Sequence, residues 1–151
     1  KFPGTQVFVF ARAGKEREFA RDLGAEWTGG PDEASPVKLD AIIDTTPAWK
    51  PVVEALSNLD AGGRLVVNAI RKENSDQDYL LKLDYPRHLW MEKETKSVAN
   101  VTRADVAEFL KLAAEIPIKP EVEVYPFEEA NRALLEIKER RIRGAKVLRI
   151  S

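Results

Sequence analysis

The sequence contains no cysteine and only one histidine, His88. Without cysteine the chain can form neither disulfides nor thiolate metal sites, and a single histidine rules out a histidine-rich zinc site. Any metal would therefore need ligands from another segment. A lone histidine without a patterned acidic neighbour is more often a packed or surface residue than a proton relay, so we assign no catalytic residue in this chain.

Long apolar runs and clusters of one charge sign are also missing. The longest apolar runs, such as residues 65–67, are strand-sized, and no N-terminal pattern of basic and then apolar residues is present. The 24 basic and 25 acidic residues leave a net charge of −1 and form no strongly charged stretch. We expect a cytoplasmic protein that binds neither nucleic acid nor membrane.

Strand-like and helix-like segments alternate along the chain, whose 151 residues suit one domain. The first apolar run, residues 6–11, is typical of a strand buried on both faces, and residues 14–23 follow as an amphipathic helix that Gly24 ends. Strands that alternate with helices predict a parallel sheet. The other elements expected are a buried strand 40–44, a helix 49–59, a turn at Gly62 and Gly63, a strand 64–68, a polar connection 71–84, a segment 83–91 that covers a strand end, a strand 94–101, a helix begun by Thr102 and Asp105 and ended by Pro117 and Pro120, a strand 121–124, a helix 127–140 and a strand 145–150.

The ends of the predicted strands are the candidate ligand-binding positions, because ligands of open α/β sheets bind outside the carboxyl ends of the strands. These ends are 11–12, 45–46 and 68–70, each with small or polar residues. The glycine-rich phosphate turn GxGxxG occurs nowhere in the chain. Either the fold lacks this turn, or the strand that precedes it is not part of the sequence.

Six segments resemble the zinc-type alcohol dehydrogenase superfamily, the medium-chain dehydrogenases and reductases, in order and spacing. They are residues 7–25, 39–47, 59–68, 97–105, and 125–133 with 144–148. The resemblance implies a Rossmann-like, doubly wound parallel sheet truncated at its N-terminal strand. It also implies that residues 1–151 are the C-terminal, nucleotide-binding part of a longer enzyme, whose zinc-bearing catalytic domain and glycine turn precede Lys1, and that 118–151 is a tail that packs on that domain.

The resemblance also assigns roles to residues of the adenosine half of a cofactor site. Ala11 stands where NAD-preferring members place an acid that binds the ribose hydroxyls. The next residue, Arg12, suits a 2′-phosphate, which slightly favours NADP over NAD, although a solvated arginine explains it equally well. Thr45 and Thr46 match the loop beneath the adenosine; simple turn chemistry is the alternative.

For the nicotinamide half, the resemblance points to backbone contacts at two strand ends. The residues are Asn68, Ala69 and Ile70 beside the ring, and Val98 and Asn100 at the carboxamide. One departure concerns the pyrophosphate: many relatives carry arginine where this chain has Ala145, and Lys146 is the candidate replacement.

These observations favour an NAD(P)-dependent oxidoreductase that transfers hydride between a nicotinamide cofactor and an alcohol or carbonyl substrate, with zinc bound by the longer enzyme and not by this chain. By itself the chain is expected to be inactive. The alternative is a stand-alone α/β binding or regulatory module. A segment with cysteine, histidine and GxGxxG ahead of Lys1 would favour the enzyme, and an initiator methionine there would favour the module. We also expect a homodimer through the sheet edge at residues 90–101.

Overall fold

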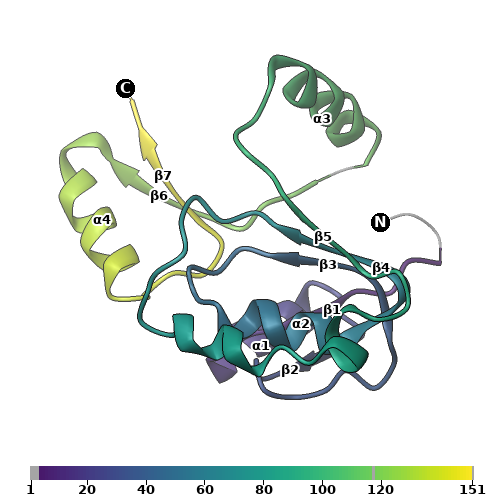
Figure 1. Cartoon of the computed structure of the whole chain (residues 1–151). Coiled ribbons are helices and arrows are strands. Elements are labelled where there is room, and N and C mark those ends of the chain that lie inside the picture. The colour runs from purple at the N-terminus through teal and green to yellow at the C-terminus, as the bar shows by residue number, and fades with distance from the viewer. Residues whose placement is uncertain (1–3, 117, 151) are drawn as a thin grey trace. The chain divides into compact units, whose positions relative to one another are not determined.

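The computed structural model describes residues 4–116 and 118–150, and its chain divides into two compact units between Val101 and Thr102 (Figure 1). All strand pairs are parallel. In chain order the elements are β1 (Phe8–Phe10), α1 (Gly14–Asp22), β2 (Trp27–Gly29), β3 (Leu39–Asp44), α2 (Lys50–Asn58), β4 (Leu59–Val67), η1 (Gln77–Lys82), η2 (Tyr85–Leu89), β5 (Glu94–Ser97), α3 (Arg103–Glu115), β6 (Val122–Pro126), η3 (Phe127–Glu129), α4 (Ala130–Lys138) and β7 (Ala145–Arg149).

Within the described residues these strands form three sheets, with the orders β1-β2, β3-β4-β5 and β6-β7. In the first, the Trp27 ring lies 5.1 Å from the Phe10 ring and 6.5 Å from the Phe8 ring, centroid to centroid. Helix α1 packs on the same pair of strands and ends before Gly24, whose φ of +92° suits glycine at a helix end. Strand β2 was not predicted, because three residues are too few to show periodicity.

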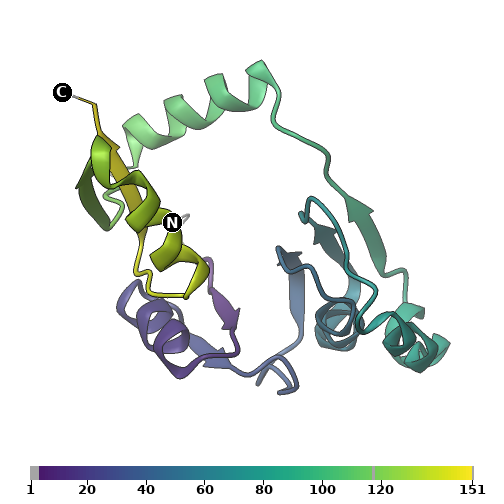
Figure 2. The ribbon, with the colours of Figure 1, turned by 90° about the vertical axis from the view of Figure 1, so that its left-hand side faces the viewer.

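The main hydrophobic core lies between α2 and the β3-β4-β5 sheet, against which α2 lies in Figure 2. The spacing of apolar residues on α2 places Val52 and Leu56 on one face, and both are buried with Leu59 and Leu65 of β4. Strand β4 therefore fixes the position of the helix, and with it the loop that leads from β3 into α2.

Two expectations about this unit were wrong, those for β4 and β3. Residues 83–91, expected to cover a strand end, contain a helical turn, η2, whose first residues are capped by the Asp84 carboxylate. Strand β4 begins at Leu59 and contains both glycines expected to form a turn, because a register shift opposite Leu39 absorbs the extra residues. Strand β3 is only partly buried, with Ile43 68% exposed, since β3 pairs with β4 and with no second described strand.

The second unit contains α3 and the β6-β7 pair with α4. Thr102 and Asp105 cap α3 reciprocally, as predicted: the Asp105 backbone N–H donates to Thr102 Oγ1 and the Thr102 N–H to the Asp105 carboxylate. The apolar face of α3 around Phe109 and Leu110 is exposed. Pro117, expected to end this helix, lies outside the described residues; the helix ends at Glu115. No helix in the described part of the chain has the length and apolar character needed to cross a bilayer.

Candidate cofactor-binding site

Three adjacent loops begin at the same edge of the β3-β4-β5 sheet. Asp44 is in register with Val67, and Val67 with Ser97, across three parallel strands. The residues that follow them, Thr45, Asn68 and Val98, therefore start neighbouring loops. The structure thus brings together two predicted groups, the 45–46 loop and the nicotinamide positions 68–70 and 98–100, at the carboxyl ends of the strands.

Backbone hydrogen bonds join the first two loops. The Asn68 N–H donates to the Asp44 carbonyl at 2.7 Å, and the Glu73 N–H donates to the Pro47 carbonyl at 2.8 Å. The polar segment that the sequence analysis described as a surface connection thus lies against the loop after β3 over several residues.

Lys72 is the centre of this contact, and sequence reasoning missed it. Its ammonium group donates to the Asp44 carboxylate, to the Thr46 carbonyl at 2.8 Å and to the Ala48 carbonyl at 2.9 Å. An ammonium has three donors, so all three are used. The side chains are 11% exposed for Lys72 and 3% for Asp44, which makes this a buried ion pair. No local signal links residues 28 positions apart.

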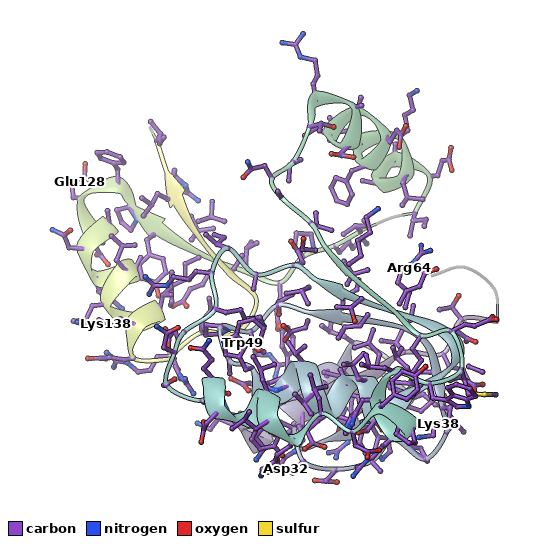
Figure 3. All side chains as sticks on the ribbon, viewed as in Figure 1. Asp32, Lys38, Trp49, Arg64, Glu128 and Lys138 are labelled. Carbon is purple, nitrogen blue, oxygen red and sulfur yellow. The ribbon has the colours of Figure 1, made fainter. Side chains whose placement is uncertain are left out.

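Asp76 extends the same contact to the start of α2, where Trp49 lies (Figure 3). Its carboxylate accepts hydrogen bonds from the backbone N–H groups of Lys50, at 2.8 Å, and Trp49, at 2.9 Å. These two bonds hold the pKa of Asp76 below its ordinary value. A carboxylate supplied from the loop after β4 thus caps the helix that follows β3.

The two predicted threonines differ in their availability. Thr46 Oγ1 donates to the Asp44 carboxylate at 2.8 Å, and its N–H approaches the same oxygen at 3.2 Å. This is local turn chemistry, and it occupies the Thr46 hydroxyl, but the hydroxyl bonds back to Asp44 and does not cap α2 as the alternative expected. Thr45 is exposed.

The nicotinamide candidates are mostly open to solvent. Asn68, Ile70 and Val98 are exposed and Ala69 is half-buried. The Val98 N–H donates to the Val67 carbonyl at 3.1 Å, which holds the third loop beside the second. Asn100 has a φ of +61°, a left-handed conformation that asparagine tolerates better than most residues.

Arg12 lies at the end of β1, in a different sheet of the same unit, and hydrogen bonds do not link that sheet to β3 within the described residues. Its side chain is exposed. A second guanidinium, not singled out from the sequence, lies beside it: Arg17 Nη1 donates to the Ala11 carbonyl at 2.9 Å and to the Arg12 carbonyl at 3.2 Å. The sequence could have indicated Arg17, because a residue in the first turn of a helix that follows a strand lies close to the end of that strand.

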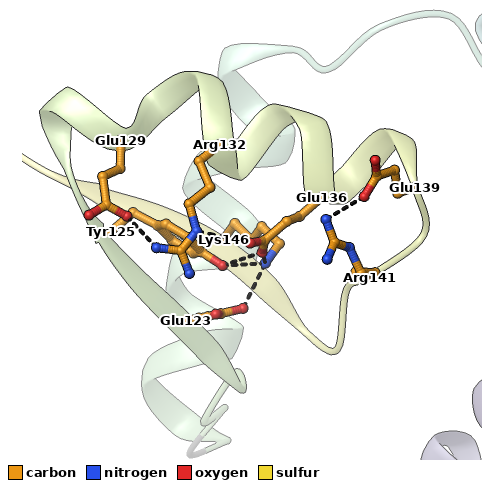
Figure 4. A network of polar contacts seen from close by, with 8 residues as sticks. All are labelled: Glu123, Tyr125, Glu129, Arg132, Glu136, Glu139, Arg141 and Lys146. Carbon is orange, nitrogen blue, oxygen red and sulfur yellow. Dashed lines mark hydrogen bonds and ion pairs between the residues drawn. The ribbon is translucent and has the colours of Figure 1, made fainter.

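Lys146, the candidate pyrophosphate ligand, is not available for that role. Figure 4 shows its ammonium group among side chains of β6 and α4, where it donates to Glu123, Glu136 and Tyr125 at 2.7, 2.6 and 2.5 Å. The side chain is 2% exposed. That expectation was wrong because alternation along β7 turns Lys146 toward α4.

The residues described here do not fit a zinc ion. His88 is buried, and its Nδ1 contacts the backbone of Asp84 one turn earlier, at 2.9 Å from the N–H and 3.0 Å from the carbonyl. Among residues 4–116 and 118–150, no three histidine, aspartate or glutamate side chains come together in a way that would hold a metal ion. We therefore derive no step through zinc at this site.

Comparisons with known proteins show which proteins this chain resembles. No family model matches the chain. Over 147 residues, 97% of the chain, it is 35% identical to the probable alcohol dehydrogenase AdhA of Mycobacterium tuberculosis. The chain is therefore similar to this alcohol dehydrogenase over almost its whole length. The predicted resemblance to alcohol dehydrogenases is thereby confirmed, and the chain spans 41% of the length of this relative.

Two solved structures share the fold of this chain. A cinnamyl alcohol dehydrogenase from Sorghum bicolor matches with a TM-score of 0.78 and 23% sequence identity. The match covers 96% of this chain and 41% of the length of that dehydrogenase. The E. coli K-12 protein YhdH with bound NADPH matches with a TM-score of 0.71 and 16% sequence identity. The match covers 98% of this chain and 48% of the length of YhdH. The Rossmann-like α/β class with parallel sheets is therefore confirmed.

Proposed function

We propose that the chain forms the dinucleotide-binding part of an NAD(P)-dependent alcohol dehydrogenase or reductase. The observation that carries this proposal is the 35% identity to a probable alcohol dehydrogenase across 97% of the chain. The register of Asp44, Val67 and Ser97 supports it, because it gathers three loops where α/β sheets bind ligands.

In this proposal the cofactor lies along the strand ends with its two halves on different residues. Arg12 and Thr45 lie beneath the adenosine half, and the backbone of 68–70 and 98–100 lies beside the nicotinamide. The guanidinium of Arg12 is exposed and can bind a 2′-phosphate, and Ala11 places no carboxylate beside it that would repel the phosphate. Both residues therefore favour NADP. The Thr46 hydroxyl takes no part, since Asp44 holds it.

The chemistry of hydride transfer needs groups that this chain does not supply. The zinc implied by the resemblance would polarise the oxygen of an alcohol or carbonyl substrate and would be bound by another part of a longer, cytoplasmic enzyme. Residues 118–151 would then pack on that part. The chain alone is expected to bind dinucleotides weakly and to leave substrate unchanged, because GxGxxG, which supplies most of the pyrophosphate contacts, is absent from it.

We further propose that two copies pair through β5. All four residues of this strand are exposed, and it forms one edge of its sheet. Glu94 and Lys96 carry opposite charges, so antiparallel pairing about a two-fold axis can set unlike charges against each other. An exposed strand edge of this kind requires charges, a covering segment or a second chain.

Binding measured residue by residue tests the main proposal. In NMR titrations of the chain, NADP⁺ and NAD⁺ should shift the amides near Arg12 and Thr45 and also those near Ala69 and Val98. Nicotinamide mononucleotide, which lacks the adenosine, should shift only the second group. Shifts scattered over both units, or none at millimolar dinucleotide, would contradict the proposal and favour the stand-alone module. Micromolar affinity would show that the phosphate site has been misplaced.

A further inference from the structure

The loops after β3 and β4 are held together by a dense set of hydrogen bonds. Eight hydrogen bonds cross between the segments 44–50 and 68–76. Two join backbone groups, three are donated by the Lys72 ammonium, and three are accepted by the Asp76 carboxylate from backbone N–H groups. Together they fix the carbonyls of Asp44, Thr46, Pro47 and Ala48, all of which point to the 68–76 segment as acceptors.

Lys72 is placed where burial of a charge is costly. A buried ion pair gains little over well-packed apolar side chains, because both groups lose their hydration. What an apolar side chain cannot do is orient two carbonyl oxygens and a carboxylate around one point. Lys72 does this with three donors, and its ammonium also lies 5.9 Å from the centre of the Trp49 ring.

Asp44 supplies the other half of the arrangement. One carboxylate oxygen accepts from the Thr46 hydroxyl and the other from Lys72. A carboxylate at a strand end is the residue type that binds ribose hydroxyls, but this one is 3% exposed and already engaged. Its role is therefore to hold Lys72 and the loop, and not to touch a ligand.

We propose that Lys72, together with Asp44, is a positioning residue that sets the conformation of the loops after β3 and β4 before the cofactor binds. This inference rests on the proposed function. The pair makes no direct contact with the dinucleotide, and it lowers the cost of binding because the loops need no reordering when the ligand arrives. Both halves of the cofactor use these loops, so the effect is the same for NAD⁺ and NADP⁺.

The test compares Lys72→Met with a matched control, Lys93→Met. Lys93 is likewise a lysine whose ammonium donates to two backbone carbonyls, of Leu56 and Arg87 at 2.8 and 2.9 Å. It lies by the C-terminal end of α2, whereas Lys72 lies by the N-terminal end. Loss of either lysine is expected to lower the melting temperature, but only one of them supports the ligand loops.

We expect Lys72→Met to raise the dissociation constants of NAD⁺ and NADP⁺ alike, by about tenfold in NMR titration, because small displacements of binding groups are costly. Lys93→Met should leave both constants unchanged, and Lys72→Arg, which keeps the charge and donors, should recover part of the affinity. If Lys72→Met does not fold, Asp44→Asn, which removes the charge at constant size, takes its place with the same expected result.

The outcomes separate this inference from the proposed function. Unmodified protein that binds neither dinucleotide contradicts the proposed function itself. Unmodified protein that binds, with a folded Lys72→Met or Asp44→Asn variant that binds equally well, overturns only the positioning role. Equal loss of affinity in Lys72→Met and Lys93→Met would show a general effect of stability and would also overturn it.

Discussion

The ammonium group of Lys146 lies 2.6 Å from a carboxylate oxygen of Glu136, and the Lys146 side chain is only 2% exposed. Burial acts to lower the pKa of Lys146, but hydrogen bonds to Glu123, Glu136 and Tyr125 outweigh it and raise the pKa above its ordinary value. The lysine therefore stays charged, and β7 and α4 are joined by a buried cation that has anionic partners on both β6 and α4.

The stability of the second unit, which begins at Thr102, is expected to depend in acid on Glu136. Its hydrogen bonds from Lys146 and Tyr125 lower its pKa from 4.5 to about 2. Because the folded pKa lies below the unfolded one, the carboxylate stabilises the fold fully above pH 4.5 and loses this contribution as the pH falls towards 2. Glu136→Gln should lower the melting temperature by several degrees at neutral pH, and by progressively less in acid.

Glu128→Gln is the matched control, since Glu128 is an exposed residue in the same unit. It should leave the melting temperature unchanged across the pH range. A difference between Glu136→Gln and the unmodified protein that stays constant from pH 7 to pH 3 would exclude the assigned pKa.

The core under the candidate site should tolerate little truncation. Leu65 of β4 is fully buried against α2. Leu65→Ala is expected to reduce the free energy of unfolding by about 2–5 kcal/mol, because it removes buried methyl groups and leaves a cavity. Chemical denaturation gives the value. Leu81→Ala, at a position 89% exposed, should change it by less than about 0.5 kcal/mol; comparable losses in both variants would contradict the assigned core.

Elements with a strong local pattern were predictable from the sequence, and contacts between distant residues were not. The helix at 103–115 follows from its Thr102 cap and apolar spacing, and Gly24 ends α1 as expected. Strand β2 and the helical turn at 85–89 have too few residues to show a period. The Lys72–Asp44 pair arises only when β3 and β4 pair, so no sequence window contains its signal.

The same distinction applies to the candidate site residues. Strand ends identified 45–46, 68–70 and 98–100, which the sheet register brings together. The sequence could not predict which of these side chains are available to a ligand, because availability depends on neighbours in the folded chain. The Thr46 hydroxyl is hydrogen-bonded to Asp44, and the Lys146 ammonium is bonded to two glutamates.

Cofactor selectivity should depend on Arg12. In the proposed longer dehydrogenase, Arg12→Ala should raise the Michaelis constant for NADP through a loss of about 1.5–3 kcal/mol of binding free energy, since only NADP offers a 2′-phosphate to the guanidinium. The constant for NAD should not change, and Ala11→Asp should shift preference towards NAD. Steady-state kinetics with both cofactors measures this.

Arg21→Ala serves as the control for Arg12, because Arg21 is also an exposed arginine but lies in the last turn of α1. It should affect neither cofactor. Equal effects of Arg12→Ala on NAD and NADP would rule out the phosphate contact and leave Arg12 as a solvated residue.

The dimer proposal can be tested at Thr95 without disturbing the sheet itself. The Val98 N–H donates to Val67 of β4, and the backbone groups of a strand alternate in direction. The N–H of Lys96 therefore points to β4, and that of Thr95 points to the open edge. Thr95→Pro removes an edge donor where proline is tolerated, whereas Lys96→Pro breaks the β4–β5 ladder.

Sedimentation of the unmodified chain should show a dimer, and Thr95→Pro should convert it to a monomer with little loss of melting temperature. Thr95→Ala, which keeps the N–H, should remain dimeric. Lys96→Pro should lower the melting temperature because it removes a bond inside the sheet. An unmodified chain that is monomeric, or a dimer that persists in Thr95→Pro, would eliminate β5 as the interface, since the outward N–H groups of this strand are the donors that a second copy would need.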